Sequence, residues 1–343
     1  QYFLMISFNS YREKSFLKNP LKNFREDVQE VEYRQDPLTG AWSRLNVDRA
    51  NRPHQAPSKP MKIAAKKDCL FCGNHLDEAT PKFSKAIVPE GRIKSGEFVL
   101  FPNLFPFAAH HAVGVLTTKH NAGLSEITAK MWADAFSGTI KWFKSVHKFD
   151  SRMRFASIDL NYMMPAAASV IHPHMQATVD RLPTSQTDLL YRKSWDYLDK
   201  AKSNFWEELC KKDRKRKVLD TGNISWHASF APKAANEVTG ILKGKSGFFE
   251  LTSENIAELS VGLAKVFHAF SKLGVRSANM AIIASPLNEN LSHFFNMHVV
   301  IISRPETKEL YTADRGFMEV LHREAVVSYI PEDFAKSMKK VIG

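Results

Sequence analysis

Two histidines and a glutamine lie at alternate positions in the sequence IHPHMQ at residues 171–176. If this segment is a β-strand, residues two apart share a face, so His172, His174 and Gln176 project together. A neutral imidazole can attack phosphorus, and a neighbouring amide can donate to a phosphoryl oxygen. A pair of satisfied core histidines is the common explanation of an arbitrary His-x-His, but His-Pro-His-x-Gln is a narrower pattern. The segment therefore favours phosphoryl-transfer chemistry.

Cys69 and Cys72 form a second chemical group, because their two-residue gap lets both thiolates reach one ion from a tight turn. Zinc commonly takes two thiolates and two imidazoles, and the candidate histidines are His75, His110, His111, His120 and His172. His120 ends an expected strand at 113–118 and His172 begins the motif strand, so neighbouring strands could present both. Two buried free cysteines and a redox pair are the alternatives. No βαβ setting for a redox pair is evident, so we favour zinc.

The elements around these residues form a weak internal repeat. In the first half, a strand at 112–116 leads into a helix at 125–148, with Ser125 as its N-cap, and then into strands at 155–160 and 170–179. In the second half, segments 226–231 and 238–242 precede a helix at 253–272 and strands at 279–284 and 293–302. His298 then occupies the place of His174. The repeat predicts duplicated α+β units, each with a helix packed on an antiparallel sheet.

Composition restricts the class of protein. The 343 residues are 44% hydrophobic and 24% charged, without an apolar run near the roughly 20 residues that span a bilayer. No basic segment followed by a long apolar one begins the chain, and only three cysteines occur, so we expect a cytoplasmic protein. The net charge of +12 suits nucleotides or sugar phosphates. The basic run 211–217 lacks interleaved aromatic residues, so we expect it to be exposed and not to bind nucleic acid.

The order of these motifs resembles a known family. The sequences RQDPLTGAW at 34–42 and RANRP at 49–53 resemble the N-terminal signature of galactose-1-phosphate uridylyltransferases. The cysteine pair, NLFP at 103–106, His120, Asn161 and SVIHPHMQ at 169–176 follow in the family's order. Segments 316–319 and 331–335 are similar to the related nucleoside-diphosphate-sugar phosphorylases. The chain is thereby identified as a member of the histidine-triad superfamily, from about Tyr33 to its end.

The resemblance implies an α+β fold of two tandem histidine-triad-like repeats, with antiparallel sheets and packed helices. The implied division of the chain is an N-terminal extension at 1–30, a first repeat at 31–185, a helical and basic connector at 186–220, and a second repeat at 221–343. The metal and the catalytic motif both belong to the first repeat.

The resemblance also assigns roles to residues. His174 becomes the nucleophile, and Gln176 binds the transferred phosphoryl group. One structural zinc is implied, with the ligands Cys69, Cys72, His120 and His172. The residues implied to bind substrate are Asn161 and Ser169 at the phosphates and Arg49, Arg52, Asn103 and Phe105 at the nucleotide. A second metal is not expected, because Leu190 stands near the family's glutamate and only His298 remains of its paired histidines.

Several residues depart from the family. Glycines before and within the catalytic motif are replaced by the segment 163–168 and by Met175, whose larger side chains could narrow a phosphate pocket. Leu104 stands where an aspartate is expected after Asn103, which bears on recognition of the ribose.

The implied function is a nucleotidyltransferase that acts on a nucleoside-diphosphate sugar through a nucleotidyl-histidine, as a hexose-1-phosphate uridylyltransferase of the UDP-glucose class. Its partners would be the nucleotide sugar and a sugar 1-phosphate or inorganic phosphate, with no membrane and a possible homodimer. One alternative is a phosphorylase of ADP-glucose-type sugars or of dinucleoside polyphosphates. A zinc-stabilised protein that binds nucleotides or RNA without turnover is the non-enzymatic alternative.

Overall fold

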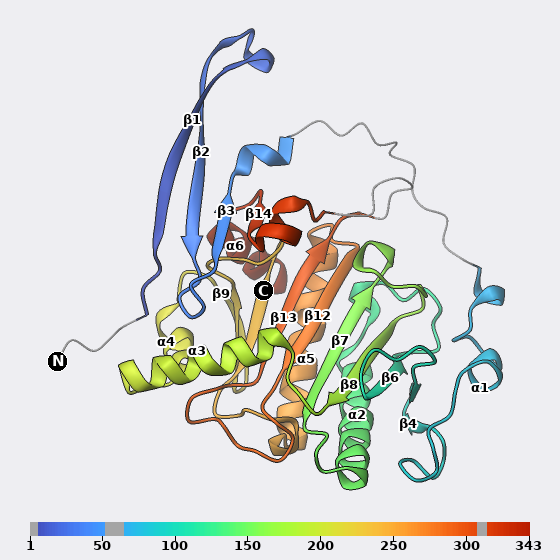
Figure 1. Cartoon of the computed structure of the whole chain (residues 1–343). Coiled ribbons are helices and arrows are strands. Elements are labelled where there is room, and N and C mark those ends of the chain that lie inside the picture. The colour runs from blue at the N-terminus through green and yellow to red at the C-terminus, as the bar shows by residue number, and fades with distance from the viewer. Residues whose placement is uncertain (1–5, 52–64, 307–313) are drawn as a thin grey trace.

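The computed structural model describes residues 6–51, 65–306 and 314–343 (Figure 1). Its strands are β1 (Ser10–Asn19), β2 (Arg25–Gln35), β3 (Trp42–Leu45), β4 (Ile93–Ser95), β5 (Phe98–Pro102), β6 (His110–Val115), β7 (Phe155–Tyr162), β8 (His174–Asp180), β9 (Lys217–Thr221), β10 (Ile224–Ala228), β11 (Val238–Leu242), β12 (Ser277–Ile283), β13 (His298–Arg304) and β14 (Ala325–Val327). Its α-helices are α1 (His75–Glu78), α2 (Ala129–Phe149), α3 (Ser185–Ala201), α4 (Phe205–Lys212), α5 (Ser253–Lys272) and α6 (Pro331–Ile342).

A ten-stranded antiparallel sheet organises the molecule, in the order β4-β5-β6-β8-β7-β12-β13-β11-β10-β9. The first five strands come from the first half of the chain, and the last five repeat the same arrangement in reverse. The halves join where β7 pairs with β12, with Asn161 opposite Asn279. The predicted α+β fold of two repeats is therefore confirmed, and the two sheets are continuous.

Matching contacts in the two halves show the duplication at the level of side chains. In the first half, the ring of Phe98 on β5 lies against Gly114 on β6 and Gly138 on α2, so closely that a Cβ at either glycine would strike it. In the second half, Trp226 on β10 lies in the same way against a glycine of β11 and one of α5, Gly240 and Gly262. Each glycine thus provides room for the large ring that joins helix to sheet.

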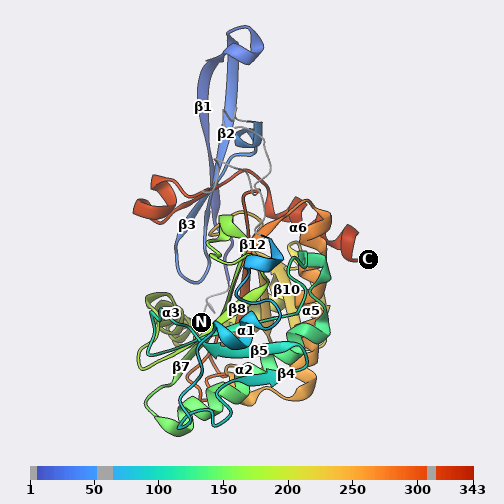
Figure 2. The same cartoon turned by 90° about the vertical axis from the view of Figure 1, so that its right-hand side faces the viewer.

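Helices cover the two faces of the sheet unequally. The residues of α2 and α5 pack in one core with Met175, Ala177 and the other inward side chains of β8. On the opposite face, α3 and α4 cover only the second half, where Leu190 and Trp206 pack with Ile241 of β11. Figure 2 shows α5 and α6 on one side of the sheet and α3 on the other. The first half of that face is covered by neither α3 nor α4, and Phe71 and Leu76 of the segment around α1 pack there on Val113 and Val115 of β6.

The start of α2 differs from the prediction. Ser125 lies in a 3-10 turn over Leu124–Glu126, and Thr128 is the residue whose side chain accepts the N–H of Met131 as the N-cap. Both residue types are suitable caps. The helix begins later than predicted because the chain forms the 3-10 turn before it. None of the described helices is long and apolar enough to cross a bilayer.

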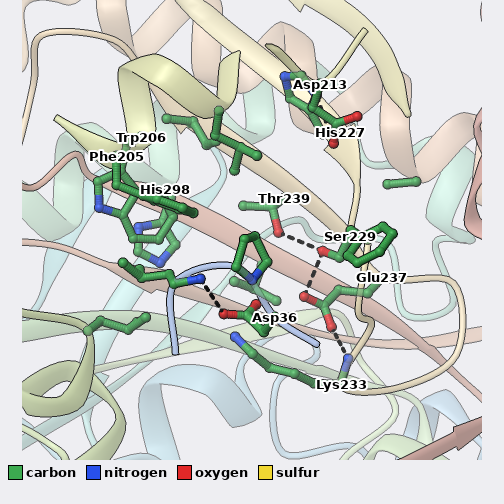
Figure 3. Close-up of a pocket in the computed structure, with 18 of the residues that line it drawn as sticks. Asp36, Phe205, Trp206, Asp213, His227, Ser229, Lys233, Glu237, Thr239 and His298 are labelled. Carbon is green, nitrogen blue, oxygen red and sulfur yellow. Dashed lines mark hydrogen bonds and ion pairs between the residues drawn. The ribbon is translucent and has the colours of Figure 1, made fainter. Parts of the chain in front are cut away.

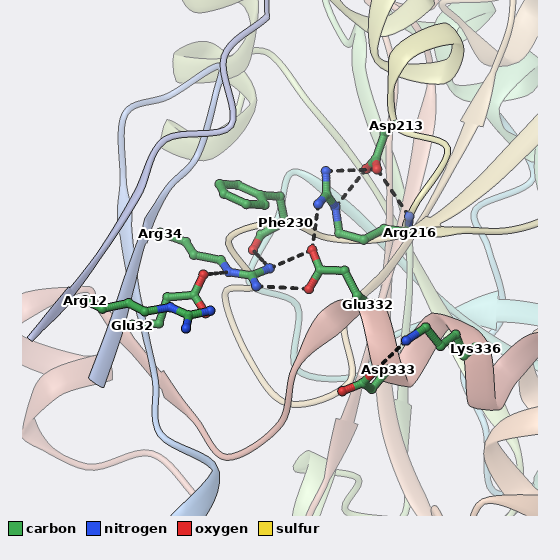
Figure 4. A network of polar contacts seen from close by, with 9 residues as sticks. All are labelled: Arg12, Glu32, Arg34, Asp213, Arg216, Phe230, Glu332, Asp333 and Lys336. Carbon is green, nitrogen blue, oxygen red and sulfur yellow. Dashed lines mark hydrogen bonds and ion pairs between the residues drawn. The ribbon is translucent and has the colours of Figure 1, made fainter. Parts of the chain in front are cut away.

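A second sheet, in the order β1-β2-β3-β14, carries the long β1–β2 hairpin that stands out from the body of the protein (Figure 1). A buried ion network fixes it to the C-terminal helix (Figure 4). Arg34 of β2 donates to both carboxylate oxygens of Glu332 on α6, at 3.0 and 2.9 Å. Arg216 donates to the same carboxylate at 2.7 Å and pairs with Asp213. Two segments of family resemblance, 34–42 and 331–335, therefore meet in space.

This network corrects the expectation that the basic run 211–217 is exposed. Arg216 and Asp213 are 4% and 3% exposed, whereas Lys211, Lys212, Arg214 and Lys215 face solvent. Arg216 is buried because Glu332 and Asp213 compensate its charge. The proposed domain boundary at residue 30 falls within β2 and that at 220 within β9, and the division of the chain stays a proposal.

Candidate active site and metal cluster

The four predicted metal ligands lie together at one end of the first repeat. The sulfur and ring nitrogen atoms of Cys69, Cys72, His120 and His172 all lie within 4.8 Å of one another. Cys72 Sγ is 3.3 Å from Nδ1 of both His120 and His172, and Cys69 Sγ is 3.7 Å from His172 Nδ1. In a tetrahedral zinc site, bonds of 2.3 Å to sulfur and about 2.05 Å to nitrogen place these atoms about 3.5 Å apart. The cluster therefore fits a tetrahedral ion.

Second contacts hold these ligands in place. The Nε2–H of His172 donates to the carbonyl oxygen of Thr117 at 2.6 Å, which leaves Nδ1 directed at the cysteines. Burial and the adjacent Cys69 raise the pKa of Cys72 to about 11. Two neighbouring thiolates are thus unfavourable unless a cation compensates them, which is the role of a bound ion.

His174 begins β8 beside the cluster, with its side chain buried. Its Nδ1–H donates to the carbonyl oxygen of His172 at 2.7 Å, so the neutral ring carries its lone pair on Nε2. Burial lowers the pKa of His174, the bond to His172 opposes this, and the nearby His172 ring lowers it further, so the ring is neutral near pH 7. No described residue hydrogen-bonds to Nε2. The ring of Phe71, between the two cysteines, lies 5.3 Å away.

Gln176 shares the face of His174, as the alternation of β8 predicts. Met175 and Ala177 are buried on the helix side of the sheet, whereas Gln176 is half-buried on the other. Met175 therefore does not narrow the face that carries His174. Gln176 Oε1 lies 2.7 Å from Nε2 of His111, a residue the sequence offered only as a metal candidate.

Asn161 lies on β7 and is held by its counterpart in the second repeat. Asn279 Nδ2 donates to Asn161 Oδ1 at 2.7 Å and to the carbonyl oxygen of Ala166 at 2.9 Å. Asn279 in turn accepts from Arg304. The sequence motifs did not identify Asn279 or Arg304, because their role arises from the pairing of β7 with β12.

Asp159 is an unexpected carboxyl group on the same face. It lies opposite Gln176 in the β7–β8 register, and its Oδ1 accepts from the Ser157 hydroxyl at 3.0 Å. Burial raises its pKa to about 7, although Ser157 lowers it. No ion pair to this carboxylate is found among the described residues. The sequence analysis did not mark it, because only the register of β7 on β8 brings it opposite Gln176.

The remaining described residues that were predicted to bind substrate lie in loops and turns, outside the strands that carry His174 and Asn161. Asn103 Oδ1 accepts the N–H of Phe105, whose ring is 82% exposed at the loop after β5. Leu104 beside it is also exposed, and Ser169 is exposed in the loop before β8. Arg49 is exposed in the 3-10 turn Val47–Asn51 after β3 and makes none of the contacts described around His174. Arg52 lies outside the described residues, so the roles of these residues stay predictions.

The second repeat carries a closed counterpart of this face (Figure 3). His298 begins β13, and its Nδ1–H donates to the carbonyl oxygen of Asn296 at 2.9 Å. The Trp206 ring is stacked on it, with centroids 4.1 Å apart, and burial lowers the pKa of His298 to about 3. A cavity of about 70 Å³ remains, lined among others by Thr239, Lys233 and Glu237. Leu190 is buried in its wall, and the absence of a second metal stays a prediction.

Comparison with known proteins identifies the fold. No protein-family model matches the chain. An uncharacterized protein of Archaeoglobus fulgidus is 27% identical over 318 residues, which cover 91% of this chain and 92% of that protein. The ADP-glucose phosphorylase of Arabidopsis thaliana, solved with bound ADP-glucose, superposes with a TM-score of 0.73 at 21% identity, covering 91% of this chain and 98% of that one.

Two further solved structures agree with this result. A GalT-like protein of Arabidopsis thaliana gives a TM-score of 0.71 at 20% identity, and a uridylyltransferase gives 0.69 at 18%. Each comparison covers 90% of this chain and 98% of the other. At these identities the likeness establishes the fold, and it confirms the resemblance to the galactose-1-phosphate uridylyltransferases at that level.

Proposed function

We propose that this chain, which has the uridylyltransferase fold, is a nucleotidyltransferase that acts on a nucleoside-diphosphate sugar through His174. The observation that carries the proposal is the neutral His174 ring, whose Nδ1–H is bound to His172 and whose Nε2 is left without a partner among the described residues. Gln176 lies on the same face, two residues along β8.

In the first half-reaction, Nε2 of His174 attacks the α-phosphorus of the nucleotide sugar. The N–P bond forms as the bond from phosphorus to the bridging oxygen breaks, and its electron pair leaves with the sugar 1-phosphate. The Nδ1–H stays bound to the His172 carbonyl, which stabilises the positive charge on the substituted ring. The Gln176 amide can donate to the phosphoryl oxygens, where charge grows in the transition state.

In the second half-reaction, a phosphate oxygen of the acceptor attacks the same phosphorus. The P–N bond breaks, and the electron pair returns to Nε2 of His174. A hexose 1-phosphate acceptor gives a uridylyltransferase of the UDP-glucose class, which is our primary proposal. Inorganic phosphate as acceptor gives a phosphorylase.

The metal cluster supports this chemistry without contacting the reaction. A zinc ion held by Cys69, Cys72, His120 and His172 would supply structural rigidity, since four protein ligands close its coordination. His172 links the cluster to the nucleophile, because its ring belongs to the cluster and its carbonyl oxygen binds His174. Gln176 and His174 are thereby held on a fixed strand.

The phosphorylase alternative has support of its own, because the Arabidopsis phosphorylase contains ADP-glucose and its fold matches this chain. The C-terminal segment of similarity to such enzymes includes Glu332, whose carboxylate fixes α6 to β2. A protein that binds nucleotides or RNA without turnover would have no need of an open Nε2 beside an amide.

A substrate panel tests the proposal. UDP-glucose, ADP-glucose and diadenosine tetraphosphate are each incubated with galactose 1-phosphate, inorganic phosphate or neither, and the released sugar 1-phosphate or nucleotide is measured. Release from a nucleotide sugar that requires galactose 1-phosphate supports the uridylyltransferase, and release that requires inorganic phosphate supports the phosphorylase. If metal-loaded protein converts no substrate and only binds it, the enzymatic proposal is wrong.

A further inference from the structure

We propose that His111 is a positioning residue, which fixes the amide of Gln176 and joins it to the loop at 103–107. The role in turnover rests on the proposed function, whereas the hydrogen-bonding arrangement does not. His111 lies on β6, the strand next to β8, where it is paired with Thr178. Gln176 is two residues from Thr178 on the same face, so the two side chains are diagonal neighbours.

The loop determines which ring nitrogen of His111 carries the proton. The backbone N–H of Phe107 lies 3.4 Å from Nδ1 of His111, and a backbone N–H can only donate. Nδ1 is therefore an acceptor. The Phe107 ring also packs on the imidazole, with centroids 4.2 Å apart.

Asn103 is a second loop residue that lies against the His111 ring. Its Oδ1 accepts the N–H of Phe105 at 3.0 Å, which fixes the amide with Nδ2 on the other side. That Nδ2 lies 3.4 Å from Nδ1 of His111 and 3.3 Å from Nε2. Because these two distances are nearly equal, Asn103 does not distinguish the tautomers, and the assignment rests on the Phe107 N–H.

A neutral His111 must then carry its proton on Nε2. Burial lowers the pKa of His111, and the bond to Gln176 opposes this only in part, so the ring is neutral near pH 7. Nε2–H therefore donates to Gln176 Oε1 across 2.7 Å. The amide NH₂ of Gln176, which has no partner among the described residues, is left to donate to a phosphoryl oxygen.

This orientation matters because the two ends of an amide act oppositely on a phosphate. The NH₂ group stabilises the growing negative charge, whereas the carbonyl oxygen would repel it. Without His111, either end of Gln176 can face the phosphoryl group. Loss of the His111 side chain should therefore slow formation of the nucleotidyl-enzyme more than it weakens binding of the nucleotide.

A double-mutant cycle tests this. His111→Phe, Gln176→Ala and the double variant are mixed with labelled nucleotide sugar, and the rate of protein labelling is measured by rapid quench. We expect His111→Phe to slow labelling at least about tenfold, and the double variant to be no slower than Gln176→Ala. His111→Gln, which keeps a donor, should recover part of the rate, and His110→Phe on the same strand should label normally. Full additivity of the two losses in folded protein would overturn the proposal.

Ring-nitrogen NMR provides a readout that needs no turnover. With ¹⁵N-labelled histidine, His111 should show the Nε2–H tautomer and His174 the Nδ1–H tautomer, assigned from His111→Phe and His174→Phe. A proton on Nδ1 of His111 would overturn the proposal even in an active enzyme. Conversely, the expected tautomers in protein that never becomes labelled would contradict the proposed function and leave the hydrogen-bonding arrangement standing.

Discussion

His174 and His298 begin equivalent strands of the two repeats, and each donates its Nδ1–H to the carbonyl oxygen two residues earlier, at 2.7 and 2.9 Å. They differ in what packs on the ring and in the residue two positions along the strand. The helix side chain Trp206 is stacked on His298, and Val300 stands where Gln176 follows His174. The duplication has thus kept the local geometry in both halves, while α3 and α4 cover the second.

The first prediction separates these two histidines with one matched substitution. His174→Phe should abolish protein labelling by a nucleotide sugar, because the nucleophile is lost. His298→Phe keeps a flat ring against Trp206 and should label at close to the wild-type rate. Labelling is measured by quench after circular dichroism has shown that both variants are folded. Loss of labelling in folded His298→Phe, with labelling kept in His174→Phe, would reverse the assignment.

The metal cluster makes a prediction about composition and stability. Unchelated protein should contain about one zinc per chain, and chelation should lower its melting temperature, because binding of the ion contributes to folding. Cys72→Ser should reduce both the metal content and the melting temperature, whereas Cys210→Ser, outside the cluster, should keep the metal. Elemental analysis and thermal melts check this. Metal-free protein with unchanged melting and activity would contradict it.

The ion network predicts that a single substitution causes a large loss of stability. Glu332→Ala leaves Arg34 and Arg216 buried without their shared carboxylate, which should cost about 3–5 kcal/mol of unfolding free energy. Asp333→Ala, in the exposed pair with Lys336 on the same helix, should cost about 1 kcal/mol or less. Denaturant unfolding measures both. Equal losses for the two variants would show that the network does not hold the hairpin to α6.

The same carboxylate predicts a dependence on pH. Burial raises the pKa of Glu332, but the hydrogen bonds from Arg34 and Arg216 outweigh it, so the pKa is lowered overall. A lowered pKa means that stability is present above the unfolded value and is lost as the pH falls through the folded one. Glu332→Ala should therefore remove part of the acid sensitivity of the wild type.

Asp159 predicts a dependence of stability on pH with the opposite sign. Its pKa is raised to about 7 by burial, from an ordinary value of 3.8. Between these values the folded state holds a proton that the unfolded state has lost, so stability falls as the pH rises from 3.8 to 7. Asp159→Asn removes this contribution. The melting temperature of the variant minus that of the wild type should therefore increase from pH 3.8 to pH 7 and stay constant above pH 7. Asp196→Asn, at an exposed position, is the control, and a difference independent of pH would contradict the account.

The sequence predicted the local elements and chemistry well. Strand 238–242 and helix 253–272 have the predicted bounds, because Thr252 supplies a strong cap and the apolar periodicity is unbroken. The four metal ligands that the family resemblance implies also come together. The environment of Arg216 was not predictable, since its partner Glu332 lies 116 residues away. The contact of His111 with Gln176 was not predicted for a similar reason, because only the register of β6 on β8 brings the two residues together.

The most direct measurement of the central claim is covalent capture of the nucleotide on His174. Protein is incubated with α-labelled UDP-glucose or ADP-glucose without acceptor, quenched, digested and analysed by mass spectrometry. We expect acid-labile, base-stable label on the peptide that contains His174, formed more slowly in Gln176→Ala and absent in His174→Ala. Turnover of the true substrate without label at any time, or normal turnover by His174→Ala, would contradict the mechanism.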